Sequence, residues 1–192
     1  MRQHPVVIDL ETKHTFREFS DPQKLGVTVL ALYDYATGKQ HIYTEDNLSS
    51  VFPLLENASY IIGYNIASFD LPVLQPYYPG NVEDLTLFDI LDDIREKIGR
   101  RIGLNDVASA TLGEKKTGHG LMAIDYYKER KWDELKKYCM DDVMVTKRLF
   151  DYGVENKEIY YLNELGKVMI PVAWRKYLED GGKSQPPMTL PF

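Results

Sequence analysis

The sequence predicts an α/β fold in which a mixed central β-sheet of about five strands is flanked by α-helices. Short segments rich in β-forming residues alternate with amphipathic segments in the order βββαβαβα. A turn at Thr37-Gly38 predicts a hairpin between two of the first three strands. The longest segment with helical periodicity follows the last strand, at residues 131–152. Together these features favour a sheet covered by helices.

Each predicted strand is a short run of apolar or β-branched residues. The first, at residues 5–12, is apolar enough to occupy the centre of the sheet. Residues 25–35 and 39–44 form the hairpin that the turn predicts, and residues 60–64 (YIIGY) and 85–88 form the last two strands.

Capping residues and prolines predict where the helices begin and end. The predicted helices are residues 46–55, capped by Asp46; residues 68–75, limited by Pro76; residues 89–98, capped by Asp89; residues 104–112, ended by Gly113; and residues 131–152. The elements form one domain, residues 1–178, followed by a tail at residues 179–192 that has no periodicity.

Composition excludes several classes of protein. The single Cys139 excludes a disulfide framework, and no cluster of Cys and His has zinc-site spacing. The chain has no apolar run long enough to span a membrane and no signal-peptide pattern, so we expect a cytoplasmic protein. The net charge of −6 argues against strong non-specific binding of nucleic acid. Divalent cations held by acidic residues would offset much of that charge.

Asp9 and Glu11 interrupt the first apolar strand. Because side chains alternate along a strand, both point to the same face as Val7 and lie about 7 Å apart along the chain. That spacing suits two ligands of one metal ion or a bridge between two ions. The alternative is a solvent-facing end of the strand.

One face of the long helix is marked by residues that recur at steps of three and four: Leu135, Tyr138, Asp142, Val145 and Leu149. Asp142 is the acid on this face, whereas Asp141 lies about 100° around the helix and is expected in solvent. A buried carboxylate needs a cation, which is a metal ion or, alternatively, an Arg or Lys partner. Tyr138, one turn earlier, reaches the same cavity or is a partly buried core tyrosine.

Asp70 follows the fourth predicted strand after a loop that contains Asn65 and Phe69. It is a third source of carboxylate oxygen if the loop brings it to the strand end. Alternatively, Asp70 stabilises the first turn of a helix through the helix dipole, Asn65 is a turn residue and Phe69 is a core aromatic.

In this order, the motifs D-x-E, N-x(3)-F-D and Y-x(3)-D resemble those of the 3′–5′ exonucleases of the DnaQ-like group in the ribonuclease H-like superfamily. Lys137 stands where the histidine type carries its base, so the chain is similar to the tyrosine (DEDDy) subclass. The segments VVIDLET, IIGYNIASFDLPVL, LNDVASATLGEKKTG and YCMDDVMVTKRL most resemble the exonuclease domain of B-family DNA polymerases and its freestanding bacterial relatives. The resemblance covers about residues 5–152.

The resemblance implies a ribonuclease H-like fold and a two-metal-ion 3′–5′ exonuclease. It implies that four carboxylates hold two divalent metal ions, Mg²⁺ or Mn²⁺, and that a tyrosine orients the attacking water; these catalytic residues are Asp9, Glu11, Asp70, Tyr138 and Asp142. The substrate-binding residues that it suggests are Leu10, Thr12, Asn65, Phe69, Lys115 and Lys116. Arg100 and Arg101 are further phosphate-contact candidates, with a solvated charged surface as the alternative.

The expected substrate is a single-stranded or frayed DNA 3′ end, in DNA repair or replication. Alternatives are a ribonuclease acting on RNA or a structure-specific endonuclease of the same fold. A non-catalytic module that binds nucleic acid or a clamp is a third alternative, which the intact acidic quartet disfavours. Some freestanding relatives accompany helicases, so a helicase is an expected partner.

The tail follows a Gly181-Gly182 hinge. From Gln185 to Phe192 it resembles the short peptides by which replication and repair enzymes bind a sliding clamp, although Pro191 departs from that pattern. A sliding clamp is therefore an expected partner of this segment. The alternative is an ordinary frayed tail, or one packed on its own domain.

Overall fold

The computed structural model describes residues 3–113 and 122–179. Its centre is a five-stranded sheet with the order β3-β2-β1-β4-β5. The first three strands form an antiparallel meander, and the last two continue the sheet parallel to the first, so the predicted mixed sheet is confirmed. The strands are β1 (Val6–Thr12), β2 (Val27–Asp34), β3 (Lys39–Thr44), β4 (Ile61–Gly63) and β5 (Leu87–Asp89).

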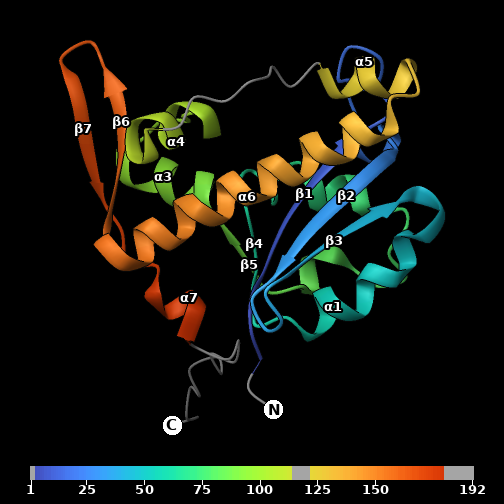
Figure 1. The fold of residues 1–192 in the computed structure, drawn as a ribbon, viewed down its shortest axis with the longest axis horizontal. Helices are drawn as coiled ribbons and strands as arrows, with labels where there is room; N and C mark the ends of the chain where they lie inside the picture. Colours follow the sequence, from blue (N-terminus) through green and yellow to red (C-terminus); the bar gives the residue numbers. More distant parts are fainter. Residues whose placement is uncertain (1–2, 114–121, 180–192) are drawn as a thin grey trace, which may run out of the picture.

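Helices cover both faces of the sheet (Figure 1). They are α1 (Phe52–Asn57), α2 (Asp70–Leu74), α3 (Ile90–Ile98), α4 (Leu104–Leu112), α5 (Met122–Lys128), α6 (Trp132–Asn156) and α7 (Arg175–Glu179), with 3₁₀ helices η1 (Pro22–Lys24), η2 (Glu45–Val51) and η3 (Val82–Asp84). One core lies between α3–α6 and the face of β1 that carries Val7; the other lies between α1, α2 and the face that carries Val6 and Ile8. Among the described residues, no helix is both long and apolar enough to cross a membrane.

One predicted helix start is wrong. Asp46 does not cap a single helix, because Thr44 takes that place and its amide donates a hydrogen bond of 2.7 Å to Oδ1 of Asn47. Asn47 has non-helical backbone angles and interrupts η2, and α1 begins only at Phe52, so the segment is not one helix. Asp89 caps α3 and Gly113 ends α4, as predicted.

A second, two-stranded sheet follows α6, where the sequence analysis assigned no element. It consists of β6 (Glu158–Asn163) and β7 (Gly166–Pro171), which pair antiparallel. Ile159 and Ile170 face each other in this hairpin and are buried, whereas Leu165 at the turn is exposed. The hairpin stands beside α4 and extends away from the main sheet (Figure 1).

The C-terminal part of α6 packs tightly on Trp174, whose ring is almost fully buried. A Cβ atom added at Gly153 would lie 2.3 Å from a ring carbon of Trp174. We expect Gly153→Ala to lower the free energy of unfolding by about 1–3 kcal/mol, because overpacking outweighs the better helix propensity of alanine.

Urea denaturation followed by circular dichroism measures this change. Glu155→Ala, at an exposed position of the same helix, is the control and should change stability by less than about 0.5 kcal/mol. Equal stability of the two variants would contradict the packing of Trp174 against Gly153.

Candidate active site

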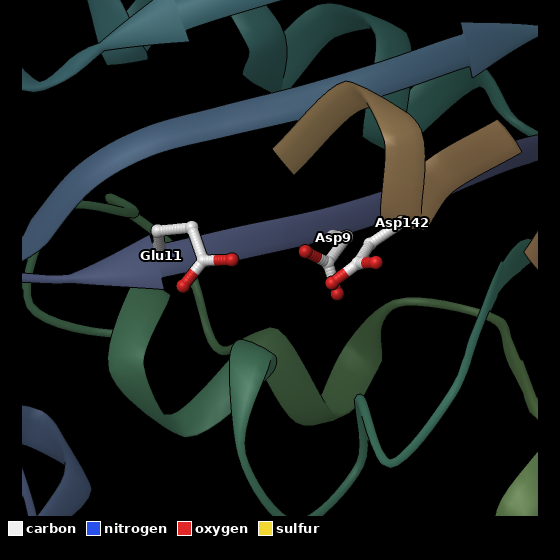
Figure 2. A group of neighbouring side chains, drawn as sticks. All are labelled: Asp9, Glu11 and Asp142. Atoms are coloured by element: carbon white, nitrogen blue, oxygen red, sulfur yellow. The ribbon is translucent and has the colours of Figure 1, made fainter. Parts of the chain in front are cut away.

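Three carboxylates converge where β1 meets α6. Asp9 and Glu11 project from the same face of β1, and Asp142 approaches them from α6 (Figure 2). One carboxylate oxygen from each residue lies within 4.8 Å of the other two. Like charges at this spacing repel one another unless cations or protons neutralise them. The arrangement therefore favours a bound cation.

Strand and helix periodicity bring these residues together. Asp9 pairs with Ala31 and Glu11 with Val29 of β2, on the sheet face that α6 covers. Asp142 is 8% exposed on the side of α6 that faces the sheet, as the helical spacing predicts. Its neighbour Asp141 is exposed and pairs with a lysine of the same helix at 2.7 Å.

A cavity of about 660 Å³ opens beside the three carboxylates. Nine of the predicted site residues line it: Asp9, Leu10, Glu11, Thr12, Asn65, Phe69, Asp70, Tyr138 and Asp142. Lys115 and Lys116 lie outside the described residues, as does the tail from Gln185 to Phe192. The cavity therefore unites three segments that are far apart in the sequence.

Asp70 differs from the other three carboxylates. It begins α2, is 3% exposed, and accepts a hydrogen bond of 3.0 Å from the backbone amide of Leu10 through Oδ1. It lines the cavity but is not part of the three-carboxylate group. Burial raises the pKa of Asp70 to about 7, the Leu10 amide opposes this rise, and the negative charge of Asp89 adds to it.

Asp89 holds the loop that leads to Asp70. Its carboxylate accepts hydrogen bonds from the backbone amides of Asn65 at 2.9 Å and Ala67 at 3.0 Å, while it also caps α3 through Leu91. Asn65 adopts a left-handed backbone conformation with φ of 70°. The sequence identified Asp89 only as a helix cap, because its contacts with the loop join distant positions that periodicity does not relate.

A family model described as the RNase H superfamily matches residues 6–154. The chain belongs to the RNase H superfamily. Among solved structures, the family B DNA polymerase of the hyperthermophilic archaeon Pyrobaculum calidifontis has a similar fold, with a TM-score of 0.60 and 18% sequence identity. The similarity covers 79% of this chain and 24% of the polymerase chain, so the chain spans about a quarter of that protein. No curated protein sequence matches the chain.

Membership of the RNase H superfamily confirms the predicted ribonuclease H-like fold and supports a nuclease activity. Nucleases of this superfamily use divalent metals. The group formed by Asp9, Glu11 and Asp142 offers only oxygen ligands, which Mg²⁺ and Mn²⁺ prefer. His14 lines the cavity, but its ring nitrogen lies 3.2 Å from the carboxylate of Glu18. The donor set therefore fits a hard divalent cation.

The loop after β1 also lines the cavity, although no motif in the sequence identified it. Phe16 and Arg17 line the cavity, and Phe16 is 54% exposed with its ring centroid 5.7 Å from that of Phe69. Aromatic faces at the mouth of a nuclease cavity suit stacking with bases. An aromatic residue soon after the D-x-E motif was the available signal, but its exposure is not readable from the sequence.

The environment of Asp70 predicts a pH-dependent effect on the metal-free protein. In the folded state Asp70 keeps its proton up to about pH 7, whereas the unfolded chain loses it near pH 4. Stability is therefore lost as the pH rises through this window, because the folded state binds more protons. Asp70→Asn stays neutral, so it should raise the free energy of unfolding by about 1–4 kcal/mol at pH 8 and have little effect near pH 4.

The measurement is urea denaturation in EDTA at both pH values. Asp141→Asn removes an exposed carboxylate and is the matched control, for which we expect no comparable gain. A stability of Asp70→Asn equal to that of the wild type at pH 8 would show that Asp70 ionises normally in the fold.

Proposed function

We propose that the protein is a metal-dependent 3′–5′ exonuclease of the DEDDy type that hydrolyses the terminal phosphodiester bonds of single-stranded or frayed DNA, in DNA repair or replication. One observation carries the proposal: the group formed by Asp9, Glu11 and Asp142 shares an open cavity with Asp70 and Tyr138 on an RNase H superfamily fold.

The four carboxylates would together hold two divalent ions. Asp9, Glu11 and Asp142 already lie close enough to share an ion, and Asp70, which lines the same cavity, would supply the fourth carboxylate. If bound there, such ions would supply Lewis-acid chemistry: a lower pKa for the attacking water and stabilisation of charge on the leaving 3′ oxygen. The Leu10 amide keeps the Asp70 carboxylate in place by its hydrogen bond.

Tyr138 positions the attacking water in this mechanism. It lies one helical turn before Asp142 and lines the same cavity. A tyrosine hydroxyl is a weak base at neutral pH, so its contribution is a hydrogen bond that orients the water.

The cavity walls favour a single-stranded end. Leu10, Thr12, Asn65 and Phe69 line it and would surround the terminal nucleotide. Phe16 beside Phe69 offers a ring to an unpaired base. The similar fold within a DNA polymerase supports DNA as the substrate.

The test uses DNA and RNA strands of about 20 nucleotides labelled at the 5′ end, incubated with Mg²⁺, Mn²⁺ or EDTA. A ladder that shortens stepwise from the 3′ end of DNA, and only with metal, is expected. Faster degradation of RNA than of DNA would assign RNA as the substrate instead of DNA. Cleavage of circular single-stranded DNA, which has no end, would show that the protein is an endonuclease.

Replacing a metal-site carboxylate should abolish activity while the fold survives. We expect Asp9→Asn, Glu11→Asn, Asp70→Asn and Asp142→Asn each to lower kcat by at least about 10²- to 10³-fold. Asp141→Asn, next to Asp142 but exposed, should keep wild-type activity. Initial rates on the labelled DNA strand test this. A loss with Asp141→Asn equal to that with Asp142→Asn would contradict the assignment.

Tyr138→Phe should leave metal binding intact but slow hydrolysis, because it removes a hydrogen bond and no metal ligand. We expect kcat to fall by about 10- to 1000-fold. Isothermal titration with Mn²⁺ and initial rates measure the two effects separately. Full activity would mean that Tyr138 only packs in the core.

A further inference from the structure

A second cavity, of about 310 Å³, adjoins the active-site cavity. Arg100, Arg101 and Ser109 line it, and we name it the arginine groove. Gly103 and Asp106 line both cavities, so the groove continues from the active site along the start of α4. A strand whose end occupies the active-site cavity can therefore extend into the groove.

The charge of the groove is opposite to that of the active-site cavity. Among the described residues that line the groove, there are two arginines and one carboxylate, that of Asp106. The described residues that line the active-site cavity include more carboxylates than arginines, with Arg17 as their one arginine. A third cavity beside α3 is also mainly acidic and is lined by Asp89, Asp92, Asp93, Glu96 and Arg95. Since the whole chain carries a charge of −6, a polyanion meets a favourable potential only locally.

Both guanidinium groups are held in place by neighbouring side chains. Cζ of Arg100 lies 4.9 Å from the centroid of the Tyr161 ring. Arg101 donates a hydrogen bond to Oδ1 of Asn65, in the loop that precedes Asp70. A guanidinium has five N–H donors, so each arginine retains donors for a phosphate after these contacts. Holding them in place lowers the entropy cost of binding.

The hairpin adds an apolar wall to the groove. Leu162 of β6 is 62% exposed and lines the groove with the arginines. Single-stranded DNA presents both phosphates and base faces, so cationic and apolar side chains in one groove match its chemistry. The superfamily model matches residues 6–154, and the hairpin follows this segment. The apolar wall of the groove is therefore not part of the matched fold.

We infer that the arginine groove binds the phosphates of the DNA strand upstream of the terminal nucleotide. The inference rests on the proposed exonuclease function, which places the 3′ end in the active-site cavity. Arg100 and Arg101 are binding residues in this assignment and take no part in the chemistry. The groove makes the enzyme favour strands that are long enough to reach it.

The test compares Arg100→Gln/Arg101→Gln with Arg95→Gln/Arg175→Gln. The control removes two exposed arginines that form surface ion pairs outside the groove. For oligo-dT of about 12 nucleotides, the groove variant should raise KM at least tenfold with kcat unchanged, and hydrolysis of a dinucleotide should not change. Its binding should also lose about 1.4 units of slope against log salt, since each single-strand phosphate contact contributes about 0.7.

Binding of labelled oligo-dT in EDTA, measured by fluorescence anisotropy, separates the two proposals. If the wild type hydrolyses DNA but the groove variant matches the control, the groove assignment fails and the function stands. If the wild type hydrolyses nothing, the function fails. A loss of binding of at least tenfold in the groove variant would then show only that the groove binds phosphates, and no loss would overturn the groove assignment as well. The assignment would be overturned if the groove variant lost as much activity on the dinucleotide as on the longer strand. Such a loss would come from breaking the hydrogen bond between Arg101 and Asn65.

Arg100→Gln alone covers the case in which the double variant is less stable. It leaves the hydrogen bond between Arg101 and Asn65 intact. This single variant should raise KM for the longer strand at least threefold, and an unchanged KM would overturn the assignment.

Discussion

The packing of α6 across β1 and β2 is the interaction on which the candidate site depends. Its side chains Leu135, Val143 and Leu149 are fully buried against the sheet. Burial of each such aliphatic side chain contributes roughly 1.5–3 kcal/mol, enough together to offset the repulsion of carboxylates gathered at the same contact. The same helix exposes Asp141 to solvent. The packing of α6 on the sheet therefore determines that Asp142, and not Asp141, lines the cavity.

The acidic residues are held by different means. Asp9 and Glu11 are fixed by the register of β1 with β2, whereas Asp70 depends on a hydrogen bond from Leu10 and on the loop that Asp89 organises. Leu10 points to the opposite sheet face from Asp9 and Glu11, yet its amide holds the fourth carboxylate. The central strand therefore positions the candidate metal ligands both with its side chains and with its backbone.

The sequence predicted features that follow from a local period. Alternation along β1 and the helical step along α6 were enough to place Asp9 and Glu11 on one face and to prefer Asp142 over Asp141. The bond from Leu10 to Asp70 joins positions 60 residues apart, so no period reveals it. Asp46 was predicted as the helix cap, but Thr44 takes this position, because both polar residues stand near the same helix start. The hairpin after α6 lies outside the family resemblance, and the clamp and helicase partners stay predictions.

A protein of net negative charge attracts a polyanion only where its positive side chains lie apart from its acidic ones. Here the carboxylates line a cavity beneath α6, and Arg100 and Arg101 lie in the groove beside it. Screening at physiological salt limits the attraction between these arginines and phosphates to about 8 Å. The arginines therefore attract a strand that is already in the groove and have little effect on DNA at a distance. Duplex DNA passing the surface would meet the net negative charge of the chain. Under the proposed function, selectivity for an unpaired end would follow from where the charges lie, without any contact that reads base sequence.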